Sequence, residues 1–463
     1  MLGVGFYFMR SNKDIDDYYV GGRKMSSGHI GLSVVATDVG GGFSIGLGGL
    51  GFAIGISGSW MLFTGLIGAW LSAYFLIPKV FKLGSKHKLF TFPEIFYHLF
   101  NPKVAFLAAI VSTIGYIGFT GAQILAGAKL ATATFPSLDI NTAVFIMGFT
   151  AVIYTVFGGL KAVIYTDTVQ WIILMGGLIF IGIPMSYFAV GGYDAIVATV
   201  PSSFLSLGAI EPVQIINWAI TIIPIWFIGM TLYQRIYACR DEKTAKKAWF
   251  IAGLLEWPIM AFMGVLLGLF AKVALDQGLF NDLAIDTTAG NFDPEMGLPI
   301  LLRSILPVGL MGLMMSAYFS AIMSTADSCL MAASGNLLSD IISKRFHIPQ
   351  EKLLRYSHLT TLFIGILALA LASQMTEVLG LMLVSYSFMV SGLFVPLIVA
   401  LFFKNRNSLA AWWSILIGGS TTLILELFKN QELLELPLGL DANLFGISAS
   451  LISYLLIAKY TKA

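Results

Sequence analysis

The feature that most constrains this chain is a succession of apolar windows, each about 20 residues long, that recur along almost its whole length. A bilayer core about 30 Å thick needs about 20 helical residues to cross it. Only 11% of the 463 residues are charged, less than half the usual share of about 25% in soluble domains. The sequence therefore predicts an all-α polytopic membrane protein, and it excludes a soluble enzyme, a nucleic-acid-binding protein and a disordered chain.

The apolar windows predict the positions of the membrane helices. We expect Met1–Met9 to be the end of a truncated leading helix. We expect twelve full transmembrane helices after it, at residues 29–52, 59–80, 104–134, 140–158, 166–190, 213–235, 248–274, 300–335, 356–373, 378–403, 408–428 and 443–459.

Basic residues are distributed unevenly between the expected loops. Of the 27 Lys and Arg residues, 23 fall in one set of alternate loops. The other set holds only Lys129, Lys272, Arg303 and Lys429. Cytoplasmic loops of membrane proteins carry an excess of Lys and Arg. The split predicts a protein of the cytoplasmic membrane whose C-terminus is cytoplasmic.

The first expected span contains three consecutive glycines, Gly40–Gly42, close to the carboxylate of Asp38. Each glycine is about 1 kcal/mol less favourable than alanine in a helix, so the run predicts a break. Unwound backbone at membrane depth is tolerated where it lines a cavity, and its free carbonyls can coordinate a cation. The alternative is that these glycines form a close-packing helix face and that Asp38 is a buried carboxyl with satisfied hydrogen bonds.

The eighth expected span places Ala321, Ser324, Thr325 and Ser328 on one helical face, because their spacing is i, i+3, i+4 and i+7. Hydroxyl and carbonyl oxygens are hard, neutral donors of the type that a small alkali cation prefers. The alternative is that these hydroxyls bond the i−4 carbonyls of their own helix. Asp327 lies on another face, where it could neutralise a lysine or support the hydroxyls.

Other polar groups within expected spans leave two interpretations open. Asp167 follows two turn glycines and is expected either to cap a helix start or to lie on an ion exit path. Gln123 and the residues Ser385–Ser387 could bond between helices or face a solute. Trp218 and Trp226 could line a solute cavity or belong to the core. Glu256 precedes Trp257 and Pro258, where it could satisfy a kink.

The sequence contains none of the common catalytic or metal-binding motifs that we searched for. Cys239 and Cys329 have no metal-ligand spacing, and no HExxH, Walker or GxSxG motif occurs. We therefore expect no catalytic activity.

Four segments, taken together, resemble signatures of the sodium:solute symporter family: Tyr19–Arg23, Ala36–Gly42, Gly158–Asp167 and Ser320–Ser328. The resemblance covers nearly the whole chain. It implies two inverted five-helix repeats, at 29–190 (helices 1–5) and 213–403 (helices 6–10), with helices 1 and 6 broken at the midplane. Residues 1–28 would then be the truncated leading helix and a cytoplasmic loop. Residues 408–463 would be two peripheral helices and a short tail.

The resemblance also implies a Na⁺ site formed by the carbonyls of Ala36, Val39 and Ala321 and the hydroxyls of Ser324 and Thr325. It places Asp38 and Asp167 on the sodium pathway. The candidates for contact with the solute are Gly40, Gly41, Gln123, Trp226 and Tyr386.

The function implied is Na⁺-coupled symport of a small organic solute, such as an amino acid, monocarboxylate, sugar or vitamin. An aromatic residue stands at the Asp38 position in the choline-type branch, so choline is disfavoured. The rival hypothesis is a membrane module that senses a solute without net transport. We expect that rival to need an output domain, which residues 408–463 do not supply.

Overall fold

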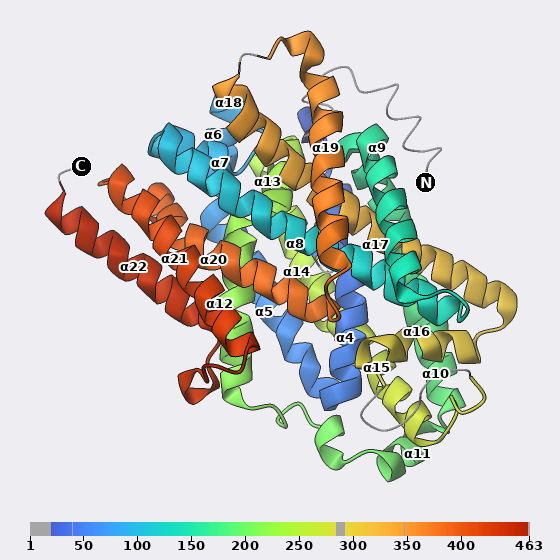
Figure 1. Ribbon diagram of the computed structural model, residues 1–463. Helices are drawn as coiled ribbons and strands as arrows, with labels where there is room; N and C mark the ends of the chain where they lie inside the picture. The colour runs from blue at the N-terminus through green and yellow to red at the C-terminus, as the bar shows by residue number, and fades with distance from the viewer. Residues whose placement is uncertain (1–19, 39, 284–291, 347, 462–463) are drawn as a thin grey trace.

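The computed structural model of the chain describes residues 20–38, 40–283, 292–346 and 348–461 (Figure 1). Every regular element in these ranges is helical. A helix pairs its backbone N–H and C=O groups within one segment, which is what a hydrocarbon environment requires. The predicted all-α class is confirmed. The expected helix at Met1–Met9 lies outside the described residues.

The longer helices follow the apolar windows of the sequence. Their bounds are α3 Ser27–Asp38, α4 Gly41–Ile54, α5 Trp60–Leu71, α6 Ile77–His87, α8 Pro102–Thr134, α9 Ile140–Gly177, α12 Pro212–Ile228, α13 Met230–Ala238, α14 Glu242–Leu254, α15 Ala261–Asp276, α16 Pro294–Ile305, α17 Val308–Gly335, α19 Gln350–Ala372, α20 Val378–Phe402, α21 Ser408–Asn430 and α22 Ala442–Tyr460. Shorter helices are α7 Pro93–Leu99, α10 Ile183–Ala189, α11 Gly192–Thr199 and α18 Ser343–Arg345. Four π-helical segments adjoin them: Ser72–Leu76 (η3), Leu178–Gly182 (η4), Leu255–Met260 (η6) and Asn336–Ile342 (η7).

In the described residues, nine helical runs are long and apolar enough to cross a membrane, or ten if α12 and α13 count as one bent span. Two of the expected spans account for the difference between ten and twelve. The first is divided between α3 and α4, and the fourth contributes Ile140–Val156 as a shorter apolar helix. The chain is therefore a multi-pass membrane protein, and the count of twelve spans stays a prediction.

Two expected helix boundaries are wrong. Helix α9 runs through the loop expected between residues 158 and 166, because a pair of glycines lowers helix propensity by about 2 kcal/mol in total without preventing a helix. The expected span 300–335 is divided into α16 and α17 at Leu306, whose backbone is extended (φ −84°, ψ 138°). The reason is Pro307, since a proline disfavours helical geometry in the residue before it.

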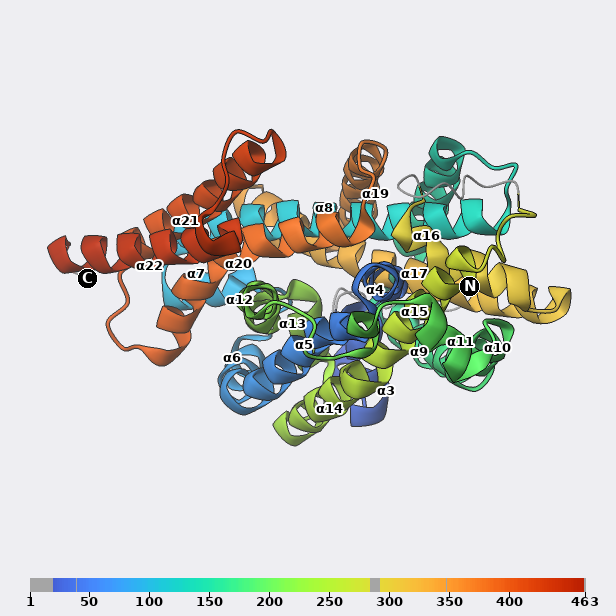
Figure 2. The same ribbon diagram turned by 90° about the horizontal axis from the view of Figure 1, so that it is seen from below.

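Helix α4 lies near the middle of the molecule, where Figure 2 shows it almost end-on among α5, α15, α16 and α17. Its second half packs very closely on α15, because a Cβ added to Gly268 would lie 1.9 Å from the carbonyl oxygen of Gly48. Small residues allow two helix backbones to approach in this way. Glycine in this half of the span thus allows α4 and α15 to pack closely, separately from the run Gly40–Gly42. Helices α21 and α22 lie together at one edge (Figure 1).

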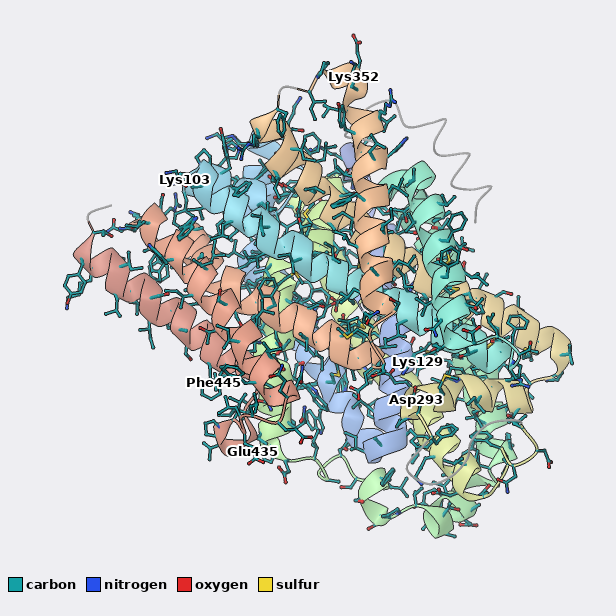
Figure 3. The ribbon with its side chains drawn as sticks, viewed as in Figure 1. Lys103, Lys129, Asp293, Lys352, Glu435 and Phe445 are labelled. Carbon is teal, nitrogen blue, oxygen red and sulfur yellow. The ribbon has the colours of Figure 1, made fainter. Side chains whose placement is uncertain are left out.

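Charged residues from alternate loops lie at opposite ends of the molecule. Lys103 and Lys352 are at one end, and Asp293 and Glu435 lie toward the other (Figure 3). The separation agrees with the alternation of basic and acidic loops in the sequence. We refer to these as the lysine end and the acidic end.

A buried ion pair joins three helices near the acidic end. Lys129 of α8 is 4% exposed, and its Nζ lies 2.6 Å from carboxylate oxygens of both Glu295 and Asp293. Glu295 also accepts hydrogen bonds from the backbone N–H groups of Val378 and Leu379, at 3.0 and 2.9 Å. Free N–H groups at a helix start favour a carboxylate. Glu295 therefore connects α16 to α8 and to the N-terminus of α20.

We predict that Lys129→Met lowers the free energy of unfolding by about 3–5 kcal/mol, because it leaves the buried Glu295 carboxylate without its cation. Lys246→Met is the matched control, since the Lys246–Glu242 pair (2.7 Å) is solvent-exposed and such pairs contribute about 1 kcal/mol or less. Thermal unfolding of the purified variants in detergent measures both. Equal losses in the two variants would contradict the structural role of the Lys129 pair.

Candidate sodium site at the broken first span

The first span is broken where the glycine run predicts. Helix α3 ends at Asp38 and α4 begins at Gly41, while Val39 lies outside the described residues. Gly40 has φ 45° and ψ 168°, a conformation that residues with a side chain avoid. A Cβ at Gly40 would also lie 2.6 Å from Thr325 Oγ1 of α17. Glycine is thus required here both by the backbone and by the closeness of α17.

The backbone groups freed by the break are taken up by two neighbouring helices. Thr325 Oγ1 lies 2.9 Å from the carbonyl oxygen of Ala36 and 3.2 Å from that of Ala321. On the other side of the break, the Gly42 N–H donates to Gln123 Oε1 of α8 at 3.1 Å. Helices α17 and α8 therefore hold the two halves of the interrupted span.

Three of the five predicted sodium ligands meet at this point. Oxygens of Ala36, Ala321 and Thr325 lie together, and Ala321 and Thr325 are fully buried. Ser324 is next to them on α17, but its hydroxyl donates to Asp167. The group consists of neutral carbonyl and hydroxyl oxygens, which suit a hard alkali cation better than imidazole or thiolate would. We call Ala36, Ala321, Ser324 and Thr325 the oxygen cluster.

Asp167 belongs to a buried polar network beside the oxygen cluster. Its carboxylate accepts hydrogen bonds from Ser33 of α3 and Ser324 of α17, and it lies 3.4 Å from Arg235 Nη2 of α13. Asp167 and Arg235 are both fully buried. The helix-cap interpretation of Asp167 is wrong, because the residue lies inside α9 and its partners are side chains of other helices.

Arg235 is the main residue of this network that sequence reasoning missed. Its guanidinium donates to the hydroxyls of Thr37 at 2.5 Å and Ser328 at 2.9 Å, and to the Ser33 carbonyl at 3.1 Å. In the sequence it lies near the basic run Arg240–Lys247 and is one of the 23 basic residues of the set of loops expected to be cytoplasmic. The signal that could have found it is its position within the apolar, Tyr-containing end of the sixth span. Asp327 accepts a hydrogen bond from Thr155 at 2.5 Å and forms no ion pair with a described lysine.

The predicted solute contacts are only partly brought together. Gly40 and Gly41 lie at the break. Gln123 accepts a hydrogen bond from the first turn of α4, so it bonds between helices, which is one of its two expected roles. Tyr386 of α20 is buried, with its ring centroid 4.9 Å from that of Phe119. Trp226 is fully buried on Gly68 of α5 and faces Trp249. Asp38 is the last residue of α3, directly before the break, and Glu256 of η6 is fully buried without a hydrogen-bond partner among the described residues.

A second break occurs in the sixth expected span. Helices α12 and α13 meet at Gly229 with a bend of 41°, where Gly229 has an extended backbone (φ −63°, ψ 112°). Arg235 follows the bend by less than two turns. The bend therefore lies close in sequence to the network that contacts α3 and α17.

A cavity of about 750 Å³ lies near the acidic end. Glycines of α4 (Gly46 and Gly49) form part of its wall, with Trp218 of α12 and the carboxylates of Glu295 and Glu377. The wall thus extends along the same helix whose N-terminus forms the break.

A multi-pass helical protein in which two interrupted helices contact a buried polar cluster has the architecture of a membrane transporter. Comparison with known proteins specifies the class. The model of the sodium:solute symporter family matches residues 18–418, so the chain belongs to that family. It is therefore a membrane transporter of a small organic solute rather than an enzyme, and its coupling ion is Na⁺.

Proteins similar to this chain are named for different solutes. The chain is 27% identical to the high-affinity proline transporter PutP of Bacillus subtilis, covering 100% of this chain and 96% of the relative. It is 26% identical to sodium/glucose cotransporter 1 of Oryctolagus cuniculus, covering 90% of this chain and 69% of the relative. A structure of a substrate-bound, outward-open Na⁺-coupled sialic acid symporter shares the fold, with a TM-score of 0.79, 23% identity, and coverage of 99% of this chain and 95% of the other.

We predict that Gly40→Ala destabilises the protein by about 1–3 kcal/mol from its backbone conformation alone, and further because its Cβ displaces Thr325. The stabilisation of the protein by Na⁺ relative to K⁺ is expected to shrink as well. Gly28→Ala is the control, since a Cβ at Gly28 meets nothing within 4 Å. Thermal unfolding in NaCl and in KCl measures both effects. An undiminished Na⁺ shift in Gly40→Ala would contradict the importance of the break.

Proposed function

We propose that the chain is a secondary active symporter that binds Na⁺ at the oxygen cluster, with the Val39 carbonyl as a further ligand. The observation that supports this most is the approach of Thr325 Oγ1 to the carbonyls of Ala36 and Ala321, at 2.9 and 3.2 Å. A cation placed among these oxygens ties the break in the first span to α17. Occupancy by Na⁺ therefore favours the conformation in which α3, α4 and α17 are together.

The electric charge of Na⁺ supplies part of the work. Moving one positive charge through 100 mV releases about 2.3 kcal/mol, before any contribution from the concentration gradient. All the oxygen-cluster ligands are neutral, so the bound ion keeps its charge while the protein changes conformation. The inward movement of Na⁺ thereby drives the inward movement of the solute.

Asp38 and Asp167 are proposed to lie on the sodium pathway. Asp167 accepts a hydrogen bond from the hydroxyl of Ser324, a member of the oxygen cluster, and so provides a carboxylate one contact away from the ion. Arg235 balances that carboxylate and limits how tightly it would hold a cation. This arrangement favours release of Na⁺ over retention.

The two breaks support two inverted repeats, 29–190 and 213–403, because each would begin with an interrupted helix. The basic loops support a cytoplasmic lysine end and C-terminus in the cytoplasmic membrane. With this orientation the 750 Å³ cavity faces outward and serves as the entrance for solute. The solute is of the amino acid, monocarboxylate, sugar or vitamin class, and Gly40, Gly41, Gln123, Trp226 and Tyr386 are the proposed contacts.

We predict that Thr325→Ala raises the Na⁺ concentration for half-maximal uptake about tenfold, which corresponds to about 1.4 kcal/mol, with little change in protein abundance. Thr325→Ser keeps the hydroxyl and should remain near wild type. Thr360→Ala is the control, because the Thr360 hydroxyl bonds only carbonyls of its own helix, α19. Uptake into reconstituted vesicles at graded external Na⁺ is the measurement. Uptake that is indifferent to Na⁺ would refute the coupling.

A further inference from the structure

A second cavity, of about 900 Å³, lies at the lysine end of the molecule, where Lys103 is found (Figure 3). Its wall comes from the start of α8, the end of η7 with α18, and the start of α21. Both η7 and α21 contact α8. The volume falls in the range of about 300–1,000 Å³ that is typical of small-molecule sites. No residue of the oxygen cluster lines this cavity, so it is separate from the proposed sodium site.

Three cationic side chains line the cavity: Lys103, Lys344 and Arg345. None of them takes part in the ion pairs of the described residues. The Nζ of Lys344 lies 4.4 Å from the centre of the Tyr97 ring, which also lines the cavity. The only carboxylate in the described wall is that of Asp340. The cavity therefore favours a ligand with a net negative charge.

Two helices begin at this cavity. Their caps, Asn101 of α8 and Asn407 of α21, each occupy one N–H group of the first turn. The N–H groups of Lys103, Ser408 and Leu409 belong to the same turns and have no acceptor among the described residues. All three residues line the cavity. Free N–H groups and the helix dipole attract phosphate oxygens, and here they add to the three cationic side chains.

The rest of the wall is apolar and aromatic. Phe106, Leu409 and Trp413 line the cavity and are 40%, 49% and 40% exposed, and Trp412 lies beside them. Tryptophan is enriched at the membrane–water interface. A free phosphate ion would occupy only the basic part of the wall, whereas a phospholipid would place its phosphate there and its acyl chains on the apolar part. The wall therefore fits a lipid.

Asp340 indicates which headgroup the lipid carries. Its side chain is 5% exposed, and its Oδ2 atom has no hydrogen-bond donor among the described residues. A buried acceptor without a donor costs free energy. A hydroxyl group on the headgroup would supply the donor, whereas a choline headgroup has neither an O–H nor an N–H group. An ethanolamine headgroup has a donor but cancels the negative charge of the phosphate.

We propose that this cavity binds an anionic phospholipid with a hydroxyl-bearing headgroup, of the phosphatidylglycerol type. Lys103, Lys344 and Arg345 hold its phosphate, and Asp340 accepts from its hydroxyl. Helix α17, which carries part of the oxygen cluster, continues directly into η7 and α18. The lipid therefore ties the end of that helix to α8 and α21. The inference concerns a site away from both the ion and the solute, and it holds whichever solute is transported.

Native mass spectrometry of the purified, delipidated full chain in a neutral detergent measures the binding. The probes are phosphatidylglycerol, phosphatidylethanolamine and phosphatidylcholine with identical acyl chains, and glycerol 3-phosphate as a phosphate ester without chains. We expect saturable binding of one phosphatidylglycerol, at a half-saturating concentration about tenfold or more below that of the two lipids without net charge. Glycerol 3-phosphate is expected to bind far more weakly.

The double variant Lys103→Gln with Arg345→Gln tests the basic residues. Both side chains are exposed, so the variant is expected to unfold at the wild-type temperature when no lipid is present. Its half-saturating concentration of phosphatidylglycerol should rise about tenfold or more. The matched control is Lys352→Gln with Arg355→Gln, two exposed basic residues of α19 that do not line the cavity. The control should bind phosphatidylglycerol as wild type does.

Asp340→Ala tests the headgroup. Phosphatidylmethanol has the same charge as phosphatidylglycerol but no hydroxyl donor. Wild type is expected to prefer phosphatidylglycerol over phosphatidylmethanol about fivefold, and Asp340→Ala should lose this preference. Equal binding of the two lipids by wild type would contradict the role of Asp340.

Two results from the wild-type chain would overturn the site as a whole. One is equal binding of phosphatidylcholine or phosphatidylethanolamine and phosphatidylglycerol, and the other is equally strong binding of glycerol 3-phosphate. Equal weakening of phosphatidylglycerol binding in the two double variants would also overturn it, because general attraction to the lysine end would then explain the binding. Each of these results leaves Na⁺-coupled uptake untouched.

Discussion

The interruption of the first span is the constraint on which the rest of the site depends. Backbone groups freed inside a membrane protein must find partners, because hydrocarbon offers none. Thr325 approaches the Ala36 carbonyl on one side of the break, and Gln123 accepts from the Gly42 N–H on the other. The carbonyl that lacks a helical partner is also the one proposed to bind Na⁺. The need to satisfy the backbone and the ability to bind an ion thus have the same origin.

The groups around the break differ in charge: some are neutral, and some are carboxylates. The oxygen cluster is neutral, so it can gain and lose a cation at small electrostatic cost. Beside it, Asp167 is balanced by Arg235 within a network that joins α3, α9, α13 and α17. Glu256 has no such balance, since neither of its carboxylate oxygens has a hydrogen-bond partner among the described residues.

Features governed by local sequence were predictable, and features governed by distant contacts were not. The break at Gly40 follows from glycine propensity, and the shared face of Ala321 and Thr325 follows from helical periodicity. The end of α16 is also a local feature, because Pro307 disfavours helical geometry in Leu306. By contrast, the burial of Arg235 and the Lys129–Glu295 pair depend on residues far apart in sequence. Basic residues next to a loop look alike in sequence whether they face water or a buried carboxylate.

The most direct test of the account is equilibrium binding of radioactive ²²Na⁺ to the purified protein without solute. The account predicts saturable binding that unlabelled Na⁺ displaces and K⁺ does not, and that is lost when Ser324 and Thr325 are both changed to alanine. Equal binding by wild type and the double variant would contradict it, because the ion would then be held somewhere other than between the broken span and α17.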